Sequence, residues 1–342
     1  MSSLSSRQLP DSAPILSLPP ELLAEIFCSF IPLYPETPRP NEPDSPLHLT
    51  AVCRTWRQVS CTTPALWRAV AMRAPDGEVS GSYPHLRILN TFLQRSGACP
   101  LALRLFGQPS GQLEELINAI LLHRPRWEYV RVNVDEVTLP RVVSLGAPMS
   151  LLKSLGLVIY ASAQPQVPPE AVPNLTSLYL WDPAPDTGAD AFPWRQLTRL
   201  RLRNVSLRQC VEILPLAVDL RFLCLKVSGD DTWPGGRKPT FVFPRLEVLI
   251  LEAAEIDGYT LLARFTLPAL RRLQIEGTWI ETEQLLNVPL LIARSKCALE
   301  QLRISRRAVN SDEVIDGVWQ GLKTVYIDAV SDEDDWIPEL LW

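Results

Sequence analysis

The chain has 342 residues and a formal net charge of −5, with 33 lysines and arginines against 38 acidic residues. This balance gives no general basic field of the kind that attracts proteins to nucleic acid or anionic lipid, so we expect neither as a partner. The length exceeds one ordinary core and favours either two domains or a small domain followed by an extended array.

The cysteine pattern indicates a reducing compartment. The seven cysteines form no C-x-x-C pair, and an odd number does not fit a disulfide framework. The first residues lack a signal-peptide pattern, and no apolar run approaches the roughly 18 residues of a membrane span. We therefore expect a soluble protein with no membrane partner, located inside the cell in the cytoplasm, the nucleus or both.

Residues 1–14 are rich in serine and proline and are expected to be disordered. The next stretch, LPPELLAEIF (18–27), predicts an amphipathic helix in which Pro20 suits the first turn. The apolar residues along one stripe of this helix are Leu22, Leu23, Ile26, Phe27 and Phe30. Closely spaced prolines then mark residues 32–46 as a loop.

Two further helices are predicted before residue 71. Residues 47–60 form the first of them, with Leu49, Val52, Cys53, Trp56 and Val59 on one face. Thr63 followed by Pro64 predicts the start of the next, which carries Leu66, Trp67 and Val70. Three short helices give a thin core, and domains of this size are often completed by a partner.

The order of these elements resembles the F-box. LPPELLAEIF is similar to that family's first-helix pattern L-P-x-E-L-L-x-x-I-F. VCRTWR (52–57) is similar to its second-helix pattern V-C-[KR]-x-W-[RK], and CTTPALW (61–67) to its usual ending. The resemblance covers residues 15–71, is of the fungal F-box receptor type, and departs from a compact F-box in its long loop at 32–46.

The resemblance implies binding to the Skp adaptor, and through it to the cullin, of a cullin–RING ubiquitin ligase. In that family the F-box helices lay apolar side chains into a helical groove of the adaptor. Matched by position, the implied contacts are Leu18, Pro19, Leu22, Ile26, Phe27, Val52, Trp56, Leu66 and Trp67. For each of them the alternative is packing within the three-helix bundle, and Leu18 and Pro19 are the favoured contacts because they lie outside the helix.

Residues 72–125 are expected to link the F-box to an array of repeats. HLRILNTFLQRSG (85–97) predicts a helix that ends at Gly97, and LALRLF (101–106) predicts a strand of alternating leucines. SGQLEELINAILLHRP (110–125) has a strong apolar stripe at helical spacing. The array is expected to begin in this segment.

From residue 126 onward, the pattern apolar-x-x-apolar-x-apolar recurs. It begins at residues 127, 152, 175, 197, 220, 246, 270, 299 and 322, with a spacing of 22 to 29 residues. The inward pairs, such as Leu178 and Leu180, predict one strand in each unit, and segments such as 208–217 and 282–294 read as short helices between strands. This region resembles a leucine-rich-repeat solenoid, without the asparagine that usually closes the consensus.

The predicted fold class is therefore α/β: a small three-helix F-box, then an irregular leucine-rich-repeat-like α/β solenoid with a parallel sheet over residues 126–342. The chain ends in SDEDDWIPELLW (331–342), which is acidic and then apolar. We expect this end to cap the last repeat, whose core face is otherwise open. A free partner-binding tail is the alternative.

One position of each repeat lies between the two inward residues and faces the other side of the sheet. These positions are Arg131, Gly156, Tyr179, Arg201, Cys224, Ile250, Gln274, Arg303 and Tyr326. Aromatic residues and arginine are enriched at interface anchors. The predicted target-binding residues are Tyr179, Trp181, Arg199, Arg201, Arg203, Arg303 and Tyr326. They would receive an acidic or phosphorylated segment, because arginine binds carboxylate and phosphate as a fork; a solvated arginine face is the alternative.

The sequence has no nucleophile, P-loop or metal motif. His48, His85 and His123 have no metal spacing, GDDTWPGG (229–236) lacks the ligand spacing of a calcium loop, and DEDD (332–335) reads as a solvated acidic run. We therefore expect no cofactor, no metal and no enzymatic activity. The best interpretation is a substrate receptor of an SCF-type ligase that binds an unknown target protein; a non-degradative scaffold or inhibitor is the alternative, and an enzyme is a third.

Overall fold

The computed structural model divides the chain into two compact units, Met1–Trp127 and Glu128–Trp342. The residues it describes are 15, 18–75, 84–143, 146, 148–162, 165–184, 187–228, 233, 239–252, 261–277, 287–306 and 324–328. For residues 276, 277, 305, 306 and 324–328 it describes the backbone alone.

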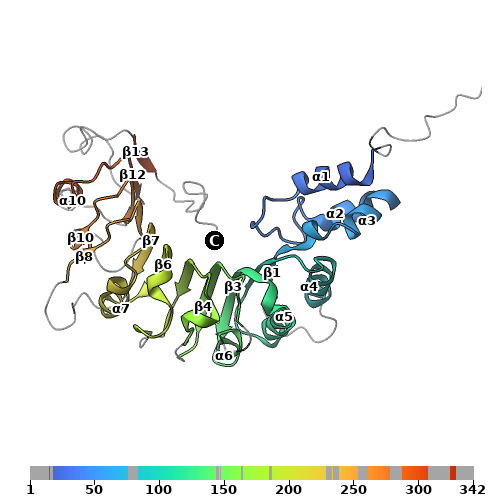
Figure 1. Ribbon diagram of the computed structural model, residues 1–342, viewed down its shortest axis with the longest axis horizontal. Helices are drawn as coiled ribbons and strands as arrows, with labels where there is room; N and C mark the ends of the chain where they lie inside the picture. The colour runs from blue at the N-terminus through green and yellow to red at the C-terminus, as the bar shows by residue number, and fades with distance from the viewer. Residues whose placement is uncertain are drawn as a thin grey trace, which may run out of the picture. The chain divides into compact units, whose positions relative to one another are not determined.

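The first unit contains helices and a pair of parallel strands (Figure 1). Its elements are α1 (Pro20–Phe30), α2 (Pro46–Val52), α3 (Arg54–Cys61), the 3-10 turn η2 (Pro64–Trp67), β1 (Ala69–Arg73), α4 (Pro84–Arg95), β2 (Leu101–Phe106), α5 (Gly111–Leu121) and the 3-10 turn η3 (Arg124–Arg126). β1 and β2 pair in parallel, from Ala69 beside Ala102 to Arg73 beside Phe106. The helices predicted at 20–30, 85–97 and 110–125 and the strand at 101–106 are confirmed.

The structure differs from the sequence prediction in the second and third helices. The single helix predicted over residues 47–60 is two helices, because Cys53 is extended (φ −155°, ψ 177°). The sulfur of Cys53 accepts a hydrogen bond from the Trp56 N–H at 3.5 Å and so starts α3. The third predicted helix is only the turn η2: Thr63 does not cap it, and its hydroxyl donates to the Val59 carbonyl at 2.7 Å instead.

Trp67 lies in the core of the first unit and is 1% exposed. Its Nε1–H donates to the Ser60 carbonyl at 2.7 Å, which satisfies the polar atom of an otherwise apolar side chain. Its ring meets Phe92 of α4 edge to face, with centroids 5.1 Å apart, and the Arg95 guanidinium lies 4.4 Å from its ring centroid. The N-terminal helices therefore share one core with α4.

The long proline-rich loop is held against the unit at both its middle and its end. The Ala71 N–H of β1 donates to the Pro38 carbonyl at 3.0 Å. The Arg68 guanidinium lies 3.8 Å from the centroid of the Tyr34 ring, and the hydroxyl of Ser45 accepts from the Leu47 N–H at the start of α2. The loop therefore packs as part of the domain rather than separating its helices.

The second unit is an α/β region with a long parallel sheet. Its strands, in chain order and in the order in which they pair, are β3 (Trp127–Asp135), β4 (Ser154–Tyr160), β5 (Ser177–Trp181), β6 (Arg199–Val205), β7 (Phe222–Val227), β9 (Val248–Leu251), β11 (Arg272–Gly277), β12 (Gln301–Arg306) and β13 (Thr324–Asp328). β8 (Phe241–Val242) and β10 (Phe265–Thr266) form a separate parallel pair. The described helices include α6 (Thr138–Val143), α7 (Leu207–Ile213) and α10 (Asn287–Ser295), with 3-10 turns η4 (Pro169–Ala171), η5 (Trp194–Gln196) and η6 (Leu214–Leu216).

Each predicted repeat supplies one strand of this sheet, and consecutive repeats are neighbours. Leu178 and Leu180 of β5 align with Leu155 and Leu157 of β4 and are at most 1% exposed. The predicted column from Arg131 to Tyr326 is also confirmed, because each of its members is the register partner of the next. Of the two helices predicted between strands, α7 and η6 cover 208–217, and the part of 282–294 before residue 287 lies outside the described residues.

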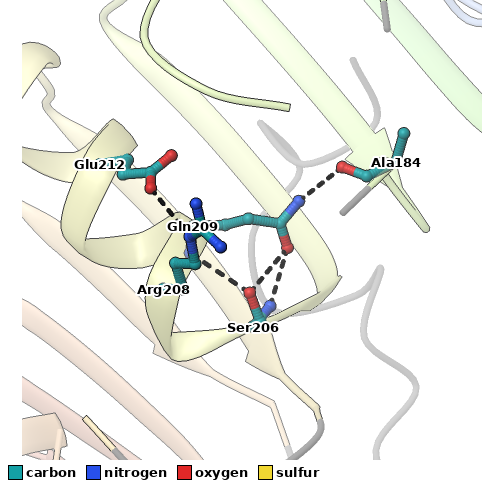
Figure 2. A network of polar contacts seen from close by, with 5 residues as sticks. All are labelled: Ala184, Ser206, Arg208, Gln209 and Glu212. Atoms are coloured by element: carbon teal, nitrogen blue, oxygen red, sulfur yellow. Dashed lines mark hydrogen bonds and ion pairs between the residues drawn. The ribbon is translucent and has the colours of Figure 1, made fainter. Parts of the chain in front are cut away.

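The helices α6, α7 and α10 lie along one face of the sheet (Figure 1). Figure 2 shows how α7 is fixed to the loop before it. Ser206 and Gln209 form a reciprocal capping box: the Gln209 N–H donates to the Ser206 hydroxyl at 3.2 Å, and the Ser206 N–H donates to Gln209 Oε1 at 2.9 Å. Gln209 Nε2 also donates to the buried carbonyl of Ala184 at 2.9 Å. The Gln209 side chain thus caps the start of α7 and also gives the Ala184 carbonyl, in the loop after β5, its hydrogen-bond donor.

Replacing Gln209 by alanine should lower the free energy of unfolding by about 2 kcal/mol, because both a helix cap and a buried carbonyl lose their partner. Urea unfolding followed by circular dichroism measures this. The matched control is Arg208→Ala in the same turn, whose exposed pair with Glu212 (3.1 Å) should cost less than about 0.5 kcal/mol. Equal losses in the two variants would contradict the role given to Gln209.

Candidate functional site

An apolar stripe on α1 faces away from the core of the first unit. Leu22, Ile26 and Phe30 follow one another at a spacing of four residues and are 46%, 44% and 45% exposed. On the other side of the same helix, Leu23 and Phe27 are buried. Large apolar side chains exposed in a row are typical of an interaction surface.

The residues implied as adaptor contacts divide by burial. Pro19, Leu22, Ile26 and Val52 are exposed, Leu18 and Trp56 are half-buried, and Phe27, Leu66 and Trp67 are 1% exposed. The Phe27 and Trp56 rings pack together, with centroids 4.8 Å apart. The three buried residues therefore pack the domain, which is the alternative stated for them, whereas the exposed ones remain available to a partner. Phe30 was predicted on the stripe but not among the contacts.

In the second unit, the predicted target-binding residues of β5 and β6 lie on the sheet face opposite to the inward leucines. We call this the arginine face, formed by Arg131, Tyr179, Trp181, Arg199, Arg201, Arg203 and Glu252. The ring of Tyr179 lies between two guanidinium groups, at 4.0 Å from Arg131 and 5.3 Å from Arg201. Arg203 lies 5.5 Å from the Trp181 ring and Arg199 lies 5.4 Å from that of Phe222. Such cation–π contacts attract each guanidinium group to the face of the neighbouring ring.

Gly156 makes room for one of these contacts. Arg131 lies on β3 and Tyr179 on β5, so the arginine side chain must cross β4 between them at Gly156. A Cβ at position 156 would come within 2.8 Å of Arg131 Cγ, closer than such contacts allow. The absence of a side chain at Gly156 therefore permits Arg131 to reach Tyr179.

A buried carboxylate holds two of the arginines together. Glu252, which follows β9, lies 3.0 Å from Arg201 Nη2 and 2.6 Å from Arg203 Nε. The thiol of Cys224 donates to Glu252 Oε1 at 2.8 Å. Burial raises the pKa of Glu252, but the charges of Arg201 and Arg203 outweigh burial and lower it below its ordinary value. Burial and the Glu252 charge raise the pKa of Cys224 well above 9.0, so the thiol keeps its proton.

Exposure varies among the predicted target-binding residues, and Trp181, Arg199 and Arg203 are half-buried. Tyr179, Arg201 and Arg303 are 7%, 9% and 7% exposed. The Tyr179 hydroxyl is buried without a hydrogen-bond partner in the part of the chain that the structure describes. Only the backbone of Tyr326 is described, and it pairs with Arg303.

Sequence reasoning missed Glu252, because a single glutamate after a strand has no distinguishing pattern.

The acidic run at 332–335 lies outside the described residues, as does the loop 229–236 except for Trp233. Within the described ranges, no helix has the length and apolar character needed to cross a bilayer.

Replacing Glu252 by glutamine should lower the free energy of unfolding by about 3 kcal/mol at pH 7, because two guanidinium groups would stay buried without their carboxylate. Urea unfolding measures the loss. The matched control is Glu247→Gln, which removes an exposed carboxylate 3.8 Å from Arg221 and should cost less than about 1 kcal/mol.

The loss should depend on pH in one direction. A carboxyl whose pKa is lowered in the folded state stabilises the fold at pH values above its ordinary pKa of 4.5. This stabilisation is lost as the pH falls through the lowered pKa. The difference between wild type and Glu252→Gln should therefore shrink as the pH falls below 4.5. A difference that stayed constant from pH 7 to pH 3 would show that the charge of Glu252 does not stabilise the fold.

Comparison with known proteins gives a family match for the N-terminal part of the chain. Residues 15–73, from the approach to α1 through the end of β1, match the family model described as F-box-like. No curated protein matches the chain. The resemblance of the three N-terminal motifs is thus confirmed, and the exposed stripe of α1 belongs to an F-box-like domain.

Proposed function

We propose that this chain is the substrate-receptor subunit of an SCF-type cullin–RING ubiquitin ligase. The observation that carries the proposal is the exposed stripe of Leu22, Ile26 and Phe30 on the first helix of an F-box-like domain. F-box domains generally bind Skp adaptors, and these side chains are the ones on α1 that can be buried against a partner without unfolding the domain. Pro19 and Val52, also exposed, extend the proposed contact.

In this proposal the second unit binds the target. Nine strands recur at the spacing of leucine-rich repeats and pair in chain order, which supports a leucine-rich-repeat-like array. Its arginine face has the composition of an interface anchor, with guanidinium groups over the rings of Tyr179 and Trp181. Ubiquitin transfer is assigned to other subunits, so the chain itself acts as a non-catalytic intracellular receptor.

The test is adaptor binding by the full chain carrying Leu22→Asp and Ile26→Asp. Both side chains are exposed, so the variant should fold, whereas two carboxylates in an apolar contact should weaken binding to a purified Skp adaptor at least 100-fold. Isothermal titration measures the affinity, and circular dichroism checks the fold.

The matched control is Leu122→Asp, which places the same charge on an 83%-exposed leucine at the end of α5. This variant should bind the adaptor as wild type does. If the double variant also binds with unchanged affinity, α1 is not the docking helix. If wild type does not bind the adaptor at all, the receptor proposal is wrong and a scaffold built on the sheet becomes the better interpretation.

A further inference from the structure

The arginine face adjoins an apolar cluster that lies on the same side of the sheet. Phe222 and Cys224 of β7 and Val248 and Ile250 of β9 form this cluster and are 1–7% exposed. They alternate with the inward leucines of the same strands, so they point away from them. The described helices α6, α7 and α10 lie along one face of the sheet (Figure 1). We infer that this is the face of the inward leucines, because buried apolar residues of these helices, such as Ile213 and Leu291, pack against an apolar layer. The cluster is therefore shielded from solvent on the face where none of these helices packs.

The chemistry around the cluster specifies what fits there. On one side lie the cationic residues of β6 and β7, where Arg199 pairs in register with Phe222 and Arg203 with Lys226. Glu252 supplies the carboxylate that contacts Arg201 and Arg203. Nearby, the Tyr179 hydroxyl is buried without a partner in the described residues. A segment with carboxylates beside bulky apolar side chains would satisfy both parts of this surface.

The end of this chain has that composition. Residues 331–342, SDEDDWIPELLW, carry an acidic run followed by two tryptophans, an isoleucine and two leucines. The described chain ends at Asp328, the last residue of β13, and the strand order from β13 to β7 is β13-β12-β11-β9-β7. At about 4.8 Å per strand, β7 lies about 19 Å away. The residues 329–342 can span about 46 Å when extended, at roughly 3.3 Å each.

We propose that the segment 331–342 binds in cis to the arginine face and the adjoining apolar cluster, so that an acidic target segment must displace it. Its carboxylates would contact the guanidinium groups, and its tryptophan and leucine side chains would cover Phe222, Val248 and Ile250. A tethered segment acts at an effective concentration in the millimolar range, so a weak contact is enough to keep it bound. This binding mode differs from a cap on the last strand, because binding of the segment would depend on the arginines of β6.

The test measures trans binding of a fluorescein-labelled peptide with the sequence SDEDDWIPELLW to the full chain by fluorescence anisotropy. In wild type the tethered copy competes. In the full-chain variant Asp334→Asn, Asp335→Asn, Trp336→Ala, here called the open variant, the tethered copy is weakened. The peptide should therefore bind the open variant at least tenfold more tightly than wild type, and more weakly as salt concentration rises. This measurement needs no adaptor, so its failure would leave the proposed receptor function untouched.

The location of the site is tested in the open variant. Adding Arg199→Glu should weaken peptide binding at least tenfold, whereas the matched control Arg208→Glu reverses an exposed charge on α7 and should change nothing. A peptide whose acidic residues are replaced by asparagine and glutamine should bind at least tenfold more weakly, and this arm alters no residue of the protein. Equal affinity for wild type and open variant, or tight binding that ignores both Arg199→Glu and the neutral peptide, would overturn the proposal.

Discussion

In the second unit, parallel strands lie in one register, and successive side chains on each strand point to opposite faces of the sheet. These two constraints determine which residues meet on each face. Because neighbouring repeats align residue for residue, each inward leucine continues a buried column, and the position between two leucines continues a second column on the opposite face. A residue's place in its repeat therefore decides both its face and its neighbours. Arg131, Gly156 and Tyr179 lie far apart in sequence yet form one contact, since the register places them on adjacent strands. A shift by one residue in any strand would exchange the core with this face.

The same register places charged arginine side chains on a sheet face that is largely shielded from water, and these charges need partners. Guanidinium groups on a sheet face lose hydration, which is costly unless they are paired. Arg201 and Arg203 meet Glu252, and the aromatic rings of Tyr179 and Trp181 receive guanidinium groups on their faces. Arginine suits this role better than lysine, because its planar, weakly hydrated group both stacks and binds a carboxylate as a fork. The face is thus held in place before any partner arrives.

Much of the architecture can be predicted from the sequence, because it depends on apolar residues that recur at regular spacing along the chain. The repeat spacing and the inward leucine pairs predict nine strands and their order, and the confirmed column from Arg131 to Tyr326 follows from the same pattern. Two kinds of feature were not predicted from the sequence: one local break in the backbone, and contacts between residues that are distant in the sequence. The break at Cys53 arises from one extended residue inside an otherwise helical pattern. Phe27 packs against Trp56 and Trp67 packs against Phe92 of α4, and the ion pair of Arg201 depends on Glu252, 51 residues away.

The two candidate sites differ in how they are prepared for a partner. On α1 the apolar side chains are already exposed, so binding there needs no rearrangement and gains the free energy of burying them. On the sheet, the apolar cluster and Arg201 are already shielded from solvent. Under the proposed intramolecular contact, a partner would therefore gain affinity only by exchanging one set of contacts for another. Exchange of this kind lowers the apparent affinity of every ligand but penalises most those that match only the charge or only the apolar part. Under the proposed function, the sheet face would therefore suit the selection of a ligand, and the helix would suit the binding of one constant partner.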